Sequence, residues 1–193
     1  MSVNANLTLH FLALCGSLRR VSSNLSLLRA ALLLELQGVD LRLAEPLDRL
    51  PHFNPDLDEA PYPEAVLRWR EEIAAADAVI LCSPEYAFSL PGVLKNALDW
   101  LVPSGELYEK PVAVLTAAPN QRTPAKAQRH LLETLSAQQV RLVQEASVTV
   151  TFPRDGFDAR GALTDPEAAA RLRAAIEALA AAVRSPPSVA QGG

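Results

Sequence analysis

The pattern of apolar and polar positions predicts buried strands that alternate with amphipathic helices. Residues 7–15 and 77–82 form apolar runs, too hydrophobic for a strand with one wet face, so both predict strands covered on two sides. His10 lies in the first run and is interpreted as a core histidine. The five predicted strands are 7–15, 39–43, 77–82, 111–116 and 140–151.

Apolar residues between these strands recur at helical spacing. Helices are predicted over 22–37, which Gly38 would end, over 64–76, after Pro91, over 124–137, and in a final segment. In that last segment Thr164 and Glu167 have the spacing of a capping box. A stripe of Leu172, Ile176, Leu179 and Val183 follows.

Five strands alternating with five helices predict an α/β fold with a parallel, doubly wound sheet between two helical layers. Right-handed crossovers are compatible with the flavodoxin-like three-layer sandwich and its strand order 2-1-3-4-5. We expect one domain over residues 1–184 and a disordered tail at 185–193. In this order the first and third strands are neighbours, so loops 16–24 and 83–91 should flank one crevice at the carboxyl edge.

Composition narrows the possible functions. The 193 residues are 49% hydrophobic with a net charge of −4 and no basic cluster, which argues against nucleic-acid binding. No apolar run is long enough for a membrane span, and we expect a cytoplasmic protein. Cys15 and Cys82 are interpreted as buried, inert thiols. Three scattered histidines without metal-ligand spacing predict no metal site.

The first loop has the composition of a phosphate cradle. Ser17, Ser22 and Asn24 supply neutral donors at the start of a helix, whose free amides favour an anion. Arg19 adds a charge-assisted contact. The loop has one glycine and no Gly-Lys-Ser/Thr, so it fits one phosphate monoester better than a nucleoside triphosphate. The alternative is that residues 22–24 only cap the helix.

The second loop, Ser-Pro-Glu-Tyr-Ala-Phe-Ser-Leu-Pro over residues 83–91, joins the buried third strand to a helix. Pro84 removes one amide donor and fixes φ, so the neighbouring amides are held in set directions. Such a loop suits a flat heteroaromatic ligand. The alternative is an ordinary strand–helix connection that contains proline.

Together these loops resemble the NADPH-dependent FMN reductase family, flavodoxin-like proteins that include quinone, azo-dye and chromate reductases. The resemblance rests on Gly-Ser-Leu-Arg at 16–19 with Ser22 and Asn24, and on Pro-Glu-Tyr at 84–86. Ser89, Pro-Gly at 91–92, Leu-Lys-Asn at 94–96 and Asp-Trp at 99–100 extend it. Segments 51–57 and 161–165 are also similar, so most of the chain is covered.

The resemblance implies FMN as cofactor, NADPH or NADH as hydride donor, and a quinone-like or other small acceptor. It implies a homodimer or homotetramer and no catalytic side chain, because the flavin carries the chemistry. The implied FMN-phosphate residues are Ser17, Arg19, Ser22 and Asn24. The implied isoalloxazine-lining residues are Pro84, Glu85, Tyr86, Ala87 and Phe88.

Two departures from the family pattern keep an alternative open. Ala87 stands where the family has asparagine after Pro-Glu-Tyr, and the bulky Phe88 follows it. Residues 117–124 contain no glycine, although the family usually has a glycine-rich loop there. Arg122 in this loop is either a contact for a dinucleotide phosphate or a solvated side chain. The alternative function is a flavodoxin-type electron carrier without its own efficient NAD(P)H site.

Overall fold

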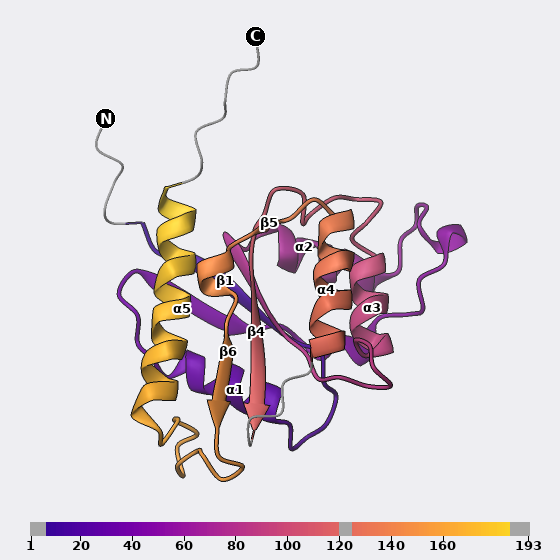
Figure 1. Ribbon diagram of the computed structural model, residues 1–193. Coiled ribbons are helices and arrows are strands. Elements are labelled where there is room, and N and C mark those ends of the chain that lie inside the picture. Colours follow the sequence, from indigo (N-terminus) through magenta and orange to yellow (C-terminus); the bar gives the residue numbers. More distant parts are fainter. Residues whose placement is uncertain (1–6, 120–124, 186–193) are drawn as a thin grey trace.

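A parallel sheet forms the middle layer, in the strand order β2-β1-β3-β4-β5, which confirms the predicted order and fold class (Figure 1). The computed structural model describes residues 7–119 and 125–185. All pairs of named strands are parallel. The strands are β1 (Leu9–Cys15), β2 (Val39–Leu43), β3 (Ala78–Cys82), β4 (Pro111–Pro119), β5 (Arg141–Leu142) and β6 (Thr149–Phe152).

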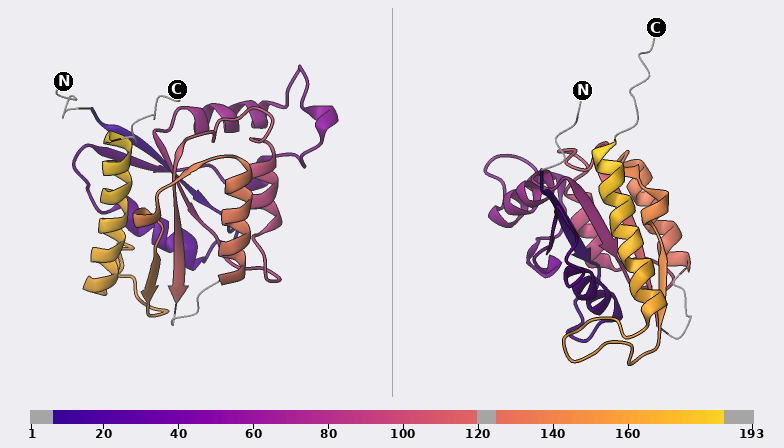
Figure 2. Two further views of the ribbon diagram at one scale, coloured as in Figure 1. Left: turned by 45° about the horizontal axis from the view of Figure 1, so that its top comes forward. Right: turned by 90° about the vertical axis from the view of Figure 1, so that its left-hand side faces the viewer.

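Helices cover both faces of the sheet. In Figure 2, α1 and α5 lie on one side and α2, α3 and α4 on the other, which agrees with two separate clusters of buried residues. The α-helices are α1 (Ser23–Leu32), α2 (Glu64–Ala74), α3 (Gly92–Asp99), α4 (Ala125–Ala137) and α5 (Pro166–Arg184). Short 3-10 turns are η1 (Leu47–Arg49), η2 (Pro55–Leu57) and η3 (Gln144–Ala146).

The predicted fifth strand over 140–151 is interrupted. β5 pairs with the start of β4 and β6 with its end, and η3 lies between them. Ser147 compensates for the interruption, because its Oγ accepts from the Val114 amide at 3.1 Å and donates to the Val143 carbonyl at 2.9 Å. β4 also continues to Pro119, so residues 117–119 are strand and not the predicted loop. The rest of that loop, 120–124, lies outside the described residues.

Three further predictions need correction. The first helix ends at Leu32 because Leu33 and Leu34 donate to carbonyls three residues back and Glu35 then adopts φ 45°. His10 is exposed rather than in the core, with Nδ1 3.1 Å from Asp40 on β2. Asp165, not Thr164, caps α5 by accepting from the Glu167 and Ala168 amides.

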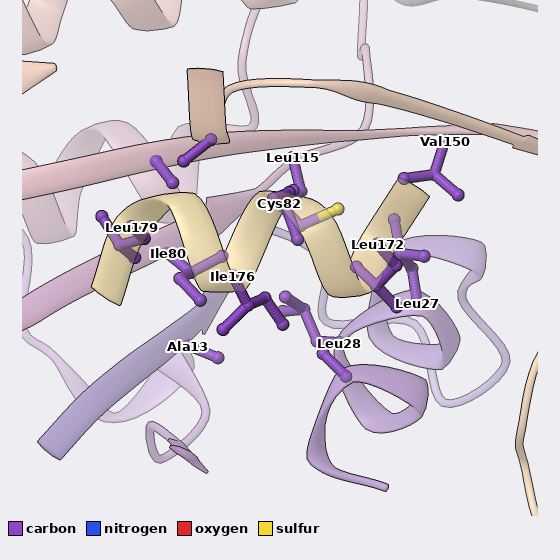
Figure 3. Packing of buried hydrophobic residues seen from close by; sticks show 14 of the residues in the cluster. Ala13, Leu27, Leu28, Ile80, Cys82, Leu115, Val150, Leu172, Ile176 and Leu179 are labelled. Atoms are coloured by element: carbon purple, nitrogen blue, oxygen red, sulfur yellow. The ribbon is translucent and has the colours of Figure 1, made fainter. Parts of the chain in front are cut away.

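The core is aliphatic on both faces. Figure 3 shows Leu172, Ile176 and Leu179 of α5 packed over Ile80 and Leu115 of the sheet, with Leu27 and Leu28 of α1 beside them. Burial of such side chains contributes about 1.5–3 kcal/mol each relative to exposure. No helix in the described ranges is long and apolar enough to cross a membrane. The core therefore holds the carboxyl ends of β1 and β3 side by side, where the two predicted loops begin.

Candidate functional site

The two loops meet at the carboxyl edge of the sheet. Ser17 Oγ lies 3.5 Å from Tyr86 Oη, and the Gly16 amide donates to the Cys82 carbonyl at 2.9 Å. A Cβ on Gly16 would lie 2.7 Å from Ser83 Oγ, which is closer than real Cβ contacts. Glycine at position 16 therefore permits this approach, and the prediction that the two loops meet at this edge is confirmed for these residues.

The first loop gathers polar side chains that are mostly buried. Ser17, Ser22 and Asn24 expose only 7%, 6% and 7% of their surface. Ser22 Oγ accepts from the Leu25 amide, so the capping interpretation is confirmed for this residue. No acidic residue occupies the first turn of α1, so no side chain of that turn neutralises the positive end of the helix. This donor set fits a phosphate monoester.

Two arginines follow on the same loop. Arg19 and Arg20 are exposed and form no ion pair with any described residue. The Arg19 amide donates to Ser17 Oγ at 3.3 Å, which closes a tight turn. A cavity of about 280 Å³ opens beside this turn, between the loop and residues 43–48. The loop thus offers uncommitted positive charge next to open space.

The second loop is tied to α4. The Glu85 carboxylate accepts from the amides of Lys126 and Ala127 at 2.9 and 3.0 Å, so it caps the start of this helix. Ser89 Oγ lies 3.0 Å from His130 Nδ1. Glu85 therefore has a structural partner within the chain and helps to fix α4, the helix that follows segment 120–124.

A tight turn occupies the tip of the second loop. Tyr86 and Ser89 exchange two backbone hydrogen bonds, at 2.9 and 3.0 Å, around Ala87 and Phe88. Both central residues are left-handed, with φ values of 48° and 64°. Turns of this kind favour Asn-Gly because other residues are strained there. The strain is maintained by the surrounding contacts, and Phe88 keeps 65% of its surface exposed.

The helical part of the second motif anchors a distant segment. Asn96 Oδ1 accepts from the Phe53 amide at 2.7 Å, and its Nδ2 donates to the Pro51 carbonyl at 2.9 Å. The indole nitrogen of Trp100 donates to the same carbonyl at 2.8 Å, and Phe53 packs edge-on against its ring. These motif residues hold segment 51–53 and play a structural part.

Both cysteines lie at the carboxyl ends of their strands and are free, and the prediction of burial is confirmed for Cys82, whereas Cys15 is half-buried. Cys15 and Cys82 are register partners on β1 and β3, and Cys82 Sγ donates to Asn24 Oδ1 at 3.2 Å. Burial raises the pKa of both thiols, most strongly for the fully buried Cys82. A raised pKa lowers the thiolate fraction at neutral pH, so these thiols are poor nucleophiles.

A second cavity, beside η1 and α2, lacks the unpaired arginines of the first loop. This cavity, of about 390 Å³, lies over Leu47 and Trp69. Its arginines are already paired, Arg42 with Glu72, Arg49 with Glu45 and Arg68 with Glu64. Across residues 7–119 and 125–185, no group of three or more His, Cys, Asp or Glu side chains is placed to hold a metal ion.

The structure thus brings the nine predicted residues to one edge but gives them different surroundings. Ser17, Ser22 and Asn24 are buried, Arg19 is exposed, Pro84 and Glu85 are half-buried, and residues 86–88 are exposed. Sequence reasoning missed the contacts of Lys126 and His130 with the second loop. These contacts join residues about 40 positions apart, and no local spacing signals them. Arg122 lies outside the described residues.

Comparison with known proteins gives consistent results. The family model described as NADPH-dependent FMN reductase matches residues 9–155. An NAD(P)H-dependent FMN reductase of Pseudomonas aeruginosa is 37% identical over 175 residues, which cover 90% of this chain and 94% of that protein. An NAD(P)H:quinone oxidoreductase of Solanum tuberosum is 32% identical, over 87% of this chain and 89% of the relative.

Solved structures show the same fold. FerB, a flavoenzyme NAD(P)H:(acceptor) oxidoreductase from Paracoccus denitrificans, superposes with a TM-score of 0.80 at 31% identity. That comparison covers 90% of this chain and 96% of FerB. An NADH:FMN oxidoreductase in its apo form superposes with a TM-score of 0.66 at 22% identity, which supports the fold alone.

Proposed function

The chain belongs to the NADPH-dependent FMN reductase family, and from that premise we propose which residues of this chain hold its cofactor. The protein is an oxidoreductase that uses FMN with NAD(P)H as electron donor. Ser17, Arg19, Ser22 and Asn24 bind the FMN phosphate at the start of α1. The backbone of Pro84, Glu85, Tyr86, Ala87 and Phe88 lines the isoalloxazine.

One observation carries this assignment: the contact between Ser17 and Tyr86, at 3.5 Å, where the two loops meet. It supports a single ligand that touches both loops, with an anionic end at the buried donors and a flat end along the second loop. The uncompensated helix end and the unpaired arginines support the position of the phosphate. A triphosphate fits less well, because the loop has one glycine.

FMN, when bound, supplies hydride acceptance and electron delivery. The residues of this chain bind and orient it, and none is assigned as a general acid, base or nucleophile. Glu85 acts through α4, since its carboxylate is committed to two amides of that helix. The tight turn at residues 86–89 keeps the backbone of the second loop in one orientation. Catalysis thus depends on positioning.

The acceptor is proposed to be a quinone-like small molecule. Relatives that carry the name quinone oxidoreductase support this, including those from Solanum tuberosum and Arabidopsis thaliana. The same similarity favours a reductase over an electron carrier of the flavodoxin type, even though residues 117–124 lack glycine.

We further propose a homodimer or homotetramer in the cytoplasm. Large apolar side chains stay exposed beyond α3, namely Val102 and Tyr108, and subunit contacts would cover such residues. A cytoplasmic location agrees with the use of NAD(P)H. Light scattering coupled to gel filtration would measure the subunit number, and a monomer at all concentrations would contradict the proposal.

The decisive test is an anaerobic titration of the FMN-loaded protein with NADPH and, separately, NADH, followed by visible absorbance. Rapid bleaching of bound flavin, with return of colour on adding a quinone, is expected. A flavin that binds tightly but stays oxidised with both donors would favour the electron carrier. Failure to retain FMN would remove the assignment of both loops.

A further inference from the structure

An aromatic ring and a positive charge lie together on the exposed side of the second loop. Lys126 Nζ sits 3.9 Å from the centroid of the Phe88 ring. Phe88 is 65% exposed, and Lys126 is exposed and forms no ion pair with a described residue. An ammonium over a ring face is attractive and leaves the cation accessible to solvent and ligands.

The backbone presents this ring at an energetic cost. Phe88 has φ 64° and follows Ala87 at φ 48°, although neither residue is glycine or asparagine. A fold that only needed a chain reversal would be more stable with Asn-Gly at these two positions. Strained backbone that the surroundings maintain is characteristic of functional sites. The strain therefore points to a role of the turn beyond connecting β3 to α3.

The Phe88–Lys126 pair lies on the side of the second loop that faces α4. Tyr86 points its hydroxyl toward Ser17 on the first loop, whereas Phe88 contacts Lys126 at the start of α4. The turn thus reaches from the phosphate side of the site to the α4 side. Glu85, the acidic group nearest in sequence, is engaged by two backbone amides and does not pair with the Lys126 side chain.

We propose that Phe88 and Lys126 form an acceptor subsite that favours planar aromatic acceptors carrying a negative charge. The ring would stack against the acceptor and the ammonium would pair with its anionic substituent. This inference rests on the proposed function, since it places the acceptor beside the second loop. The overall reaction balances as a quinone plus NAD(P)H and one solvent proton giving a hydroquinone and NAD(P)⁺.

The test compares two acceptors that differ in charge, 1,4-naphthoquinone and 1,4-naphthoquinone-2-sulfonate, at low ionic strength. The measured quantity is the ratio of kcat/KM for the anionic acceptor to that for the neutral one. Lys126→Gln should lower this ratio about threefold, in keeping with an exposed ion pair, and Lys126→Arg should restore it. Lys95→Gln is the matched control, because Lys95 is an exposed lysine that pairs with Asp99 on α3.

A second readout avoids turnover. Calorimetry measures the binding of redox-inert naphthalene-2-sulfonate and naphthalene-2-sulfonamide to FMN-loaded protein. Lys126→Gln should weaken only the sulfonate, and Phe88→Ala should weaken both about fivefold through lost stacking. Added salt should reduce the charge effect of Lys126.

The outcomes separate the two proposals. An unchanged ratio in Lys126→Gln, or an equal fall in Lys95→Gln, would overturn the acceptor subsite. The acceptor subsite would also be overturned if Phe88→Ala changes the subunit number but leaves the affinities for the sulfonate and the sulfonamide unchanged. Loss of bound FMN in the unmodified protein would instead contradict the proposed cofactor site.

Discussion

The two loops at the carboxyl edge both resemble the family in sequence, yet their side chains have different surroundings. In the first loop, buried Ser17, Ser22 and Asn24 and the unpaired Arg19 are grouped at a helix terminus. In the second, the side chain of Glu85 is committed to α4, and the exposed side chains are those of the turn, Tyr86 and Phe88 among them. Under the proposed assignment, the first loop thus supplies ligand-binding groups and the second supplies mainly scaffold.

The largest effect is expected at Trp100, a residue of the second motif with a structural part. Trp100→Ala should lower the free energy of unfolding by about 3–5 kcal/mol, because the side chain is fully buried and its indole nitrogen holds Pro51. Trp100→Phe keeps most of the packing and loses only the hydrogen bond, so a smaller loss is expected. Urea denaturation of both variants measures this. A Trp100→Phe variant with normal stability but weak FMN binding would contradict the structural part assigned here.

For the first loop we expect the opposite result, a loss of FMN affinity with little change in stability. Arg19→Ala should weaken FMN by about 1.5–3 kcal/mol, the range for a hydrogen bond to a charged group, and leave unfolding nearly unchanged. Fluorescence quenching of added FMN gives the affinity, and apo-protein melting gives the stability. Arg20→Ala is the control, since Arg20 is adjacent and also exposed. Equal affinity losses in both variants would indicate general charge rather than a specific contact.

Glu85 tests whether the second loop acts through α4. Glu85→Ala removes the acceptor for the Lys126 and Ala127 amides, so it should cost about 0.5–2 kcal/mol of stability. Relative to the unmodified protein, this variant should exchange amide hydrogens faster in the first turn of α4. Exchange in α5 should not change, because α5 has its own cap at Asp165. Unchanged protection of the Lys126 amide would show that the cap contributes nothing.

Sequence alone predicts what depends on local pattern. The two buried faces follow from periodicity, right-handed crossovers are compatible with the strand order, and that order predicts the meeting of the two loops; the structure confirms all three. The break between β5 and β6 did not follow, because it depends on Ser147 replacing a ladder bond to Val114 across the sheet. The cap from Glu85 to α4 was missed for the same reason: both contacts link residues more than 30 positions apart.

The smallest expected effect separates strain from function in the second loop. Ala87→Gly should stabilise the protein by up to about 1 kcal/mol, because glycine adopts φ 48° without a steric cost, while its greater freedom when unfolded offsets part of the gain. Gly92→Ala is the control, because it makes the reverse exchange of glycine and alanine near this loop. At position 92 the backbone has no positive φ, and an added Cβ meets nothing within 4 Å. Thermal melting of the apo-protein measures both. If Ala87→Gly raises the Tm and loosens FMN binding, the strained turn holds the loop in its binding orientation; a variant with lower stability would show that the left-handed turn is not strained in solution.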